Sequence, residues 1–200
     1  MSEYSWRNGD RICGEPVPSD SLPQRIALTA TAVVTRTRGQ TVQLLLCNPH
    51  PESWNTWMLP YGSVVVEIAD IPLGTTFEGL IAHMQAARQR ESAAYEDTAF
   101  SEASRLAGMA GHEFRQVDSM SNYSLKFSKS AGLWTAYSFA YHIARTGESA
   151  NPSVEAVWLS IDEELIDHLL QELQFEGHSV ADNVAAILRD GAALDVLVAG

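Results

Sequence analysis

The alternation of apolar and polar positions predicts a hairpin near the start of the chain. Residues 26–37 are rich in isoleucine, valine and threonine, and residues 42–47 form a second apolar run. Both runs have the composition of β-strands. Arg38-Gly39-Gln40 lies between them and reads as a tight turn. We therefore expect two antiparallel strands, followed by a proline-containing loop and another short strand at residues 63–66.

The middle of the chain has helical spacing. From residue 75 or 76 to residue 106, apolar side chains recur at steps of three and four. A helix of about 30 residues is long for a globular protein, so a break near residues 89–92 would divide the run into two helices. Gly108 and Gly111 stand where the second helix should end.

The second half of the chain predicts several strands and then helices. A polar turn is expected at residues 113–118, and strands are expected at 123–128, 133–145 and 154–159. Ser160 and Asp162 can cap a helix that runs to Gln174. Ser179 with Asp182 offers an acidic capping box for a last helix that ends at Arg189. Mostly antiparallel strands with interspersed helices predict a mixed α/β sandwich.

The two ends of the chain differ from its middle. Residues 1–24 are polar and contain three prolines, which predicts an N-terminal arm lying on a domain at residues 25–190. Residues 191–200 form a tail that is unusually apolar for a terminus. We expect this tail to dock on its own domain or on a second subunit, which leaves a homodimer open.

Composition narrows the classes of partner. The net charge is −12, from 13 basic and 25 acidic residues, and such a field repels extended nucleic acid. A local cluster of cations could still bind a small anionic ligand. No stretch approaches the roughly 20 apolar residues that span a bilayer, and the polar N-terminus lacks a secretory core. We expect a cytoplasmic protein with no membrane partner, in which Cys13 and Cys47 are free thiols.

Three segments carry motifs of one known family, in matching order. Trp57-Met58-Leu59-Pro60-Tyr61-Gly62 is similar to a W-x-L-P-G-G stretch, with Tyr61 in place of the first glycine. Arg105-Leu106-Ala107-Gly108-Met109 is similar to the end of a signature helix. Val157-Trp158-Leu159-Ser160, followed by acidic residues from Asp162, looks like a late strand and helix start. Over residues 26–190 the chain resembles a Nudix hydrolase, which implies a Nudix-like α/β/α sandwich with a mixed, mostly antiparallel sheet.

The resemblance also locates the metal site of the family, and here the chain departs from the pattern. The Nudix signature ends in Arg-Glu, an aliphatic residue, any residue, Glu-Glu, any residue and Gly. These glutamates share one helix face and hold divalent cations that neutralise a diphosphate and activate water. If Gly108 closes the pattern, Glu102 is its first glutamate. Arg105 and Leu106 then occupy the positions of the glutamate pair.

A shifted register does not restore the pair. With Asp97 as the first glutamate, Phe100 and Ser101 fill the two positions. Glu67 could fold back toward Glu102 and act as a further metal ligand. The stretch between the Gly62 turn and the signature is also longer than the family pattern permits, so an insertion is assumed.

Several residues are candidates for binding a ligand. Arg105 has two interpretations: an ordinary helical ion pair with Glu102, or a fixed cation that holds a phosphate by paired hydrogen bonds without a metal. Trp54 and Trp57 flank a loop that lies near the ligand in Nudix-like proteins, close to the Gly62 turn. Exposed tryptophans there could stack on a base, whereas buried ones would serve packing.

Three hypotheses for function follow. The first is a Nudix-fold protein that binds a nucleotide or nucleoside-diphosphate derivative, with lost or altered hydrolytic activity and no cofactor. The second is a Mg²⁺-dependent phosphoanhydride hydrolase with a rearranged carboxylate site, in which Glu102 is catalytic and Glu102 and Glu67 bind the metal. The third is a protein-interaction module on the same scaffold. The resemblance alone does not select among them.

Overall fold

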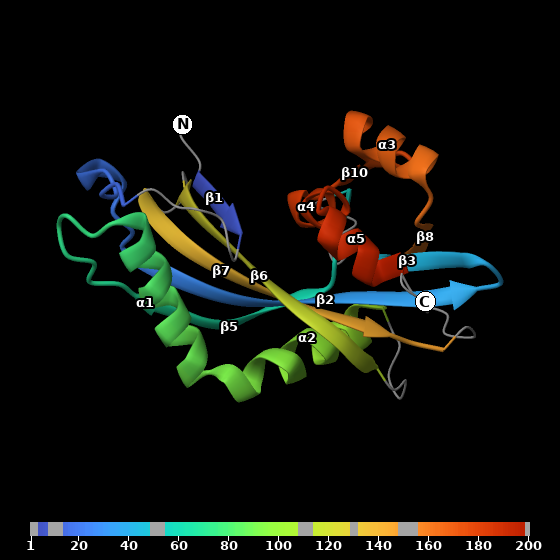
Figure 1. The fold of residues 1–200 in the computed structure, drawn as a ribbon, viewed down its shortest axis with the longest axis horizontal. Helices are drawn as coiled ribbons and strands as arrows, with labels where there is room; N and C mark the ends of the chain where they lie inside the picture. The colour runs from blue at the N-terminus through green and yellow to red at the C-terminus, as the bar shows by residue number, and fades with distance from the viewer. Residues whose placement is uncertain are drawn as a thin grey trace. The chain divides into compact units, whose positions relative to one another are not determined.

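The computed structural model describes most of the chain (Figure 1). The chain forms two compact units. The described residues are 4–7, 14–48, 55–107, 114–128, 132–147 and 156–198. Unit 1 comprises Met1–Ala30, Gly62–Thr98 and Ser119–Tyr141. Unit 2 comprises Thr31–Tyr61, Ala99–Asp118 and His142–Gly200. Each unit is described by itself.

The strands form a large, mostly antiparallel sheet and a small one. The large sheet has the order β1-β6-β7-β2-β3-β8, and β5 also pairs with β2. Its strands are β1 (Tyr4–Arg7), β2 (Arg25–Arg38), β3 (Thr41–Cys47), β5 (Tyr61–Ile68), β6 (Arg115–Ser128), β7 (Leu133–Arg145) and β8 (Ala156–Ser160). The small sheet consists of β4 (Thr56–Trp57), β9 (Gln174–Phe175) and β10 (His178–Val180). Its β4–β10 pairing is parallel and its β9–β10 pairing is antiparallel, so the predicted mixed, mostly antiparallel architecture is confirmed.

The entry hairpin is confirmed at the predicted place. Strands β2 and β3 pair antiparallel, with Thr35 opposite Leu44. Gly39 joins them with a φ of 63°, a left-handed conformation that glycine adopts without strain. On its other side β3 pairs antiparallel with β8, where Leu45 lies opposite Trp158.

Unit 1 places helix α1 (Phe77–Arg90) beside its strands (Figure 1). The side chain of Thr76 caps the helix by accepting a hydrogen bond from the backbone N of Gly79 at 3.1 Å. The buried face of α1 includes Leu80 and Met84, both fully buried. The predicted break is confirmed: α1 ends at Arg90, and α2 (Ser92–Ala107) begins one residue after Glu91.

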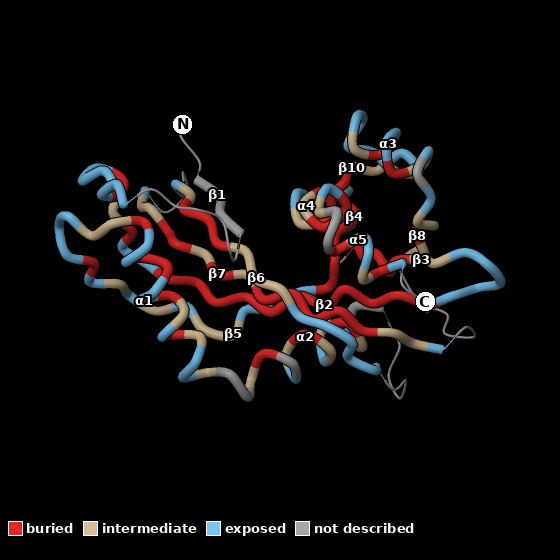
Figure 2. Tube along the Cα trace, in the orientation of Figure 1, coloured by how far each residue is buried: buried red, intermediate tan, exposed pale blue. Residues whose placement is uncertain are grey.

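Unit 2 builds its core on β3, where Leu44 to Cys47 are fully buried (Figure 2). Its helices are α3 (Glu163–Glu172), α4 (Asp182–Leu188) and α5 (Gly191–Val198). The apolar tail forms α5 and packs within unit 2, because Ala193 and Leu197 are buried. Arg145 also donates a hydrogen bond from Nη2 to the backbone oxygen of Val196 at 3.4 Å. The homodimer and the division into arm, domain and tail remain predictions.

Two local predictions about the second half of the chain were wrong. The polar turn expected at residues 113–118 is strand from Arg115 onward, because this part of β6 is exposed and therefore tolerates polar side chains. Ser179 does not cap the helix that follows it. Its backbone N instead donates to Asn55 at 3.0 Å within the small-sheet region, and α4 begins after Ala181 with no side-chain cap.

The cap at Asp162 is confirmed, although its helix is shorter than expected. Asp162 Oδ1 accepts a hydrogen bond from the backbone N of Leu165 at 2.8 Å. Helix α3 ends at Glu172 rather than Gln174, because Leu173 takes a left-handed φ of 50°. Within the described ranges, no helix combines the length and the apolar composition needed to cross a membrane.

Candidate functional site

The two predicted residues on α2 bind each other. Arg105 donates to Glu102 Oε2 from Nε at 3.0 Å and from Nη2 at 2.6 Å. The residues stand three apart on one helix face, so the pair is the ordinary helical kind. The Arg105 side chain is 66% exposed and that of Glu102 is 26% exposed. These hydrogen bonds raise the pKa of Arg105, which remains a cation neutralised by its neighbour.

Glu67, the second predicted metal ligand, also forms an ion pair with an arginine. Glu67 Oε1 accepts a hydrogen bond from Arg90 Nη2 at 3.3 Å, within unit 1. In the described part of the chain, no three His, Cys, Asp or Glu side chains gather where they could hold a metal ion. Because guanidinium groups engage both predicted carboxylates, this donor set does not fit the Mg²⁺ site that the resemblance implies.

The other predicted binding residues within the described ranges, Trp57 and Gly62, do not line the cavity found in the structure. Trp57 is only 7% exposed, and its ring centre lies 5.1 Å from that of His178. Trp57 is thus a buried packing residue and is not an exposed ring that could stack on a base. Gly62 lies within β5 and is partly buried. Trp54 falls outside the described residues, as do Gly108 and the side chain of Leu106, so a role for Trp54 in binding stays a prediction.

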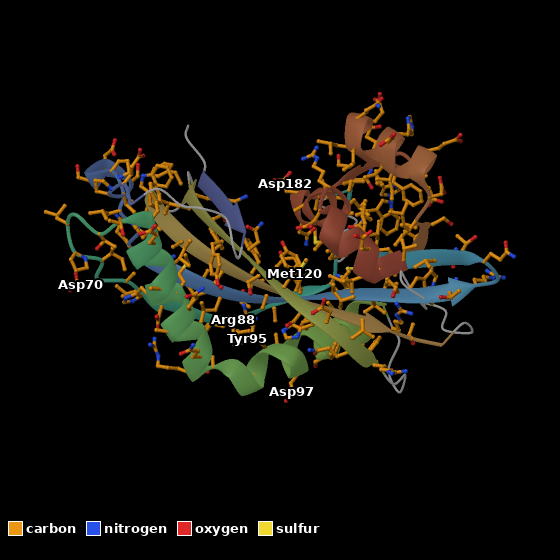
Figure 3. All side chains as sticks on the ribbon, in the orientation of Figure 1. Asp70, Arg88, Tyr95, Asp97, Met120 and Asp182 are labelled. Atoms are coloured by element: carbon orange, nitrogen blue, oxygen red, sulfur yellow. The ribbon has the colours of Figure 1, made fainter. Side chains whose placement is uncertain are left out.

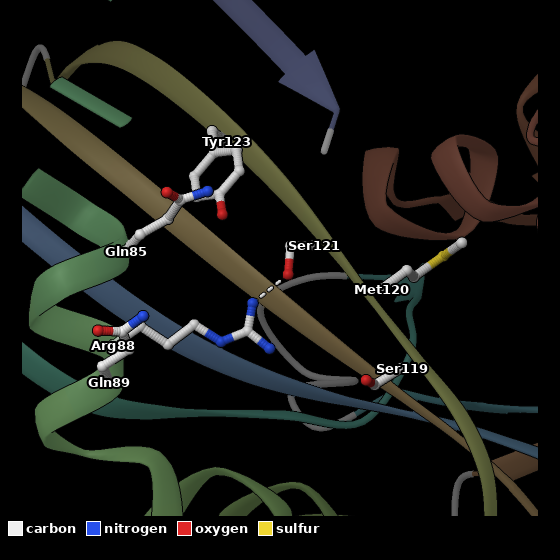
Figure 4. A pocket seen from close by; sticks show the side chains of 7 residues that line it. All are labelled: Gln85, Arg88, Gln89, Ser119, Met120, Ser121 and Tyr123. Carbon is white, nitrogen blue, oxygen red and sulfur yellow. Dashed lines mark hydrogen bonds between the residues drawn. The ribbon is translucent and has the colours of Figure 1, made fainter. Parts of the chain in front are cut away.

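The structure contains a cavity that sequence reasoning missed, in unit 1 between α1 and β6 (Figure 4). Its volume is about 480 Å³. Helix α1 supplies Gln85, Arg88 and Gln89, whose spacing of three and four residues places them on one helix face. Strand β6 supplies the other lining residues, Ser119, Met120, Ser121 and Tyr123. The odd-numbered members of this strand alternate, so they share one face of it.

Arg88 is the charged centre of this cavity, and two contacts hold it in place. Its Nη1 donates a hydrogen bond to Ser121 Oγ on β6 (Figure 4). Its guanidinium carbon lies 5.3 Å from the centre of the Tyr95 ring, and the two residues are neighbours in Figure 3. Tyr95 is 2% exposed, and burial raises its pKa to about 12. The ring under Arg88 is therefore a neutral phenol at physiological pH.

The sequence contained only a weak signal for this cavity. A polar face on an otherwise apolar helix is normally solvated. Ser119, Ser121 and Tyr123 alternate along the chain, but alternation shows only that they share a strand face. The two walls of the cavity, α1 and β6, meet where Arg88 donates a hydrogen bond to Ser121, which lies 33 residues away in the sequence. To predict the cavity from the sequence, one would have to know that α1 packs beside β6.

Comparisons with known proteins give a likeness in fold. No known sequence family matches the chain, and no curated protein matches it. A Nudix hydrolase from M. smegmatis, RenU, shares 14% identity at a TM-score of 0.46, with 80% of this chain and 81% of the other covered. The C. elegans Ap4A hydrolase shares 13% identity at 0.45, with 87% and 97% covered. A MutT/nudix family protein from Enterococcus faecalis shares 15% identity at 0.43, with 86% and 68% covered.

The resemblance to Nudix proteins predicted from the motifs thus recurs among solved structures. At these identities and TM-scores it is a likeness of fold, and it assigns neither a ligand nor an activity to this chain. Any functional proposal has to rest on the chain's own residues.

Proposed function

We propose that this protein binds a small nucleotide-like ligand, a nucleotide or a nucleoside-diphosphate derivative, in the cavity between α1 and β6. We propose further that it does not hydrolyse this ligand by a metal mechanism based on Glu102. The observation that carries the proposal is Arg88, a cation held by Ser121 and Tyr95 in a cavity whose lining, among the described residues, contains no acidic side chain.

The size and chemistry of the cavity support a small anionic ligand. Sites for small molecules usually measure about 300–1,000 Å³, and a volume of about 480 Å³ lies in that range. A guanidinium binds phosphate through short, charge-assisted hydrogen bonds. The carboxamides of Gln85 and Gln89 can both donate and accept, as the edges of a base or a ribose require. Met120 adds an adaptable apolar contact.

The ion pair on α2 supports the absence of Nudix-type hydrolysis. A carboxylate that ligates a cation must offer its oxygens to the metal. In Glu102, Oε2 already accepts two hydrogen bonds from Arg105, so a cation already lies against the carboxylate that the hydrolase hypothesis assigns to the metal. The neighbouring position that the family fills with a second glutamate carries Leu106, which has no oxygen ligand.

Calorimetric titration with adenosine monophosphate, ADP-ribose, NAD and ATP tests the proposal, with and without Mg²⁺ and with an assay for phosphate release. We expect heat of binding without Mg²⁺ for at least one ligand and no product with any of them. Arg88→Gln should weaken that binding about tenfold or more, since it removes a charge-assisted contact.

A matched control lies on the same helix. Arg90 is exposed and pairs only with Glu67 in the described residues, so Arg90→Gln should leave binding unchanged. Turnover that requires Mg²⁺ and disappears in Glu102→Gln would overturn the non-hydrolytic proposal. An absence of heat with every ligand would overturn binding itself and favour the protein-interaction module.

A further inference from the structure

We infer that the cavity accepts a single phosphate group and discriminates against polyphosphate chains, so that its ligand is a nucleoside monophosphate or a similar phosphomonoester. This inference rests on the proposed ligand site. Of the seven lining residues that the structure describes, Arg88 alone has a charged side chain at neutral pH. The other six lining residues offer two carboxamides, two hydroxyls, a thioether and a phenol.

The contacts of Arg88 limit how much anion it can hold. A guanidinium has five N–H donors, and its fork matches two oxygens of one phosphate. One donor on Nη1 is used by Ser121, and one face of the group lies over Tyr95. The remaining donors suffice for one paired interaction with a single phosphate. A second or third phosphate would have only neutral donors left to meet it.

The electrostatic surroundings point the same way. Arg88 stands in the last turn of α1, where the helix dipole places a partial negative charge of about one half. Glu91 is the first residue after α1, and its carboxylate is near enough to help raise the pKa of Tyr95. The protein as a whole carries a net charge of −12. A phosphomonoester brings about −1.5 to −2 at neutral pH, of which one guanidinium balances roughly half to two-thirds, and each added phosphate meets an unfavourable field.

A series of probes without a base isolates the effect of charge. Inorganic phosphate, pyrophosphate and tripolyphosphate would be titrated without Mg²⁺, next to adenosine, adenosine monophosphate and adenosine triphosphate. We expect the monophosphate to bind about tenfold or more tightly than the nucleoside, because it gains the contact with Arg88. We expect no gain from the monophosphate to the triphosphate, and none from phosphate to tripolyphosphate.

The pH dependence adds an independent readout. The second proton of a phosphomonoester has a pKa of about 6, so binding should strengthen as the pH rises from 5 to 7. The same rise should vanish in Arg88→Gln. Arg88→Lys, which keeps the charge but loses the fork, should bind with intermediate affinity. Should Arg88→Gln fail to fold, Ser121→Ala offers a milder test, because it removes only the group that orients the guanidinium.

The outcomes separate the two proposals. Tighter binding of triphosphate than of monophosphate, by tenfold or more and lost in Arg88→Gln, would overturn the single-phosphate inference and leave the ligand site intact. Binding of the monophosphate that is unchanged in Arg88→Gln would overturn both the inference and the site. No binding of any probe would overturn the proposed function itself.

Discussion

The guanidinium carbon of Arg88 lies 5.3 Å from the centre of the Tyr95 ring, so the cation of the cavity rests on a residue of the core. Such a contact contributes about 0.5–2 kcal/mol, depending on how far water is excluded. The Tyr95 hydroxyl is buried and makes no hydrogen bond with the described residues. The ring of Tyr95 therefore supports Arg88, whereas its hydroxyl contributes nothing evident.

Two substitutions at Tyr95 separate these contributions. Tyr95→Phe keeps the ring and removes a buried polar group without a partner, so the melting temperature should stay the same or rise. Its affinity for phosphate should match that of the wild type. Tyr95→Leu removes the aromatic face, and we expect weaker phosphate binding together with a loss of about 1–3 kcal/mol of stability. Thermal unfolding and phosphate titration measure both effects. If Tyr95→Phe binds as poorly as Tyr95→Leu, the ring does not support Arg88.

Cys47 should be unreactive in the folded protein. Its side chain is fully buried, and burial raises the pKa of the thiol to about 12. Only the thiolate reacts with disulfide reagents, so almost none of the reactive form is present near pH 8. In a Cys13→Ser variant, a thiol reagent should label Cys47 only when the protein is unfolded by urea. Rapid labelling under native conditions would contradict the burial of Cys47 in β3.

High pH should destabilise the protein through its buried tyrosines. Burial raises the pKa of Tyr95 and of Tyr141 from 10 to about 12, because the ionised form is poorly solvated. The folded state therefore holds these protons more tightly than the unfolded state. Their contribution to stability is full below pH 10 and is lost as the pH rises from about 10 to 12.

Absorbance of the tyrosinate form measures this titration. Of the six tyrosines in the chain, Tyr95 and Tyr141 should stay protonated at pH 11 while the protein remains folded. Tyr95→Phe should reduce the alkaline loss of stability. If all six tyrosines ionise together near pH 10 in the folded protein, Tyr95 and Tyr141 are not shielded from water as the structure indicates.

The C-terminal helix should contribute to the stability of unit 2. Leu197 in α5 is 1% exposed, whereas its neighbour Val198 is 52% exposed. Leu197→Ala should cost about 2–4 kcal/mol, from lost burial and the cavity left behind. Val198→Ala, the matched control, should cost less than about 0.5 kcal/mol. Urea denaturation of both variants checks the difference, and equal losses would mean that α5 does not pack through Leu197.

The features predicted correctly from the sequence depend on near neighbours in the chain. The hairpin with Gly39, the break between α1 and α2 and the cap at Asp162 all involve residues that lie close together in the chain. Local spacing determines such features. Ser179 shows the limit of this reasoning, because a backbone contact with Asn55, more than one hundred residues earlier, decides its conformation.

The cavity could not be predicted for the same reason. Its two walls come from separate elements, and Arg88 and Ser121 become neighbours only when α1 packs beside β6. Family motifs directed attention to Arg105, which the structure shows paired with Glu102. The cation with the more suitable surroundings lies in α1, outside the segments that carry those motifs.

The division into two units has a consequence for dissecting the protein. The chain passes between the units at residues 30–31, 61–62, 98–99, 118–119 and 141–142, and each of these points lies within a strand or a helix. Neither unit is therefore a contiguous stretch of sequence, and no linker separates them. A truncated gene would sever paired strands, because every crossing point lies within a strand or a helix. Fragments of this protein should be insoluble, and ligand binding should be studied only in the full chain.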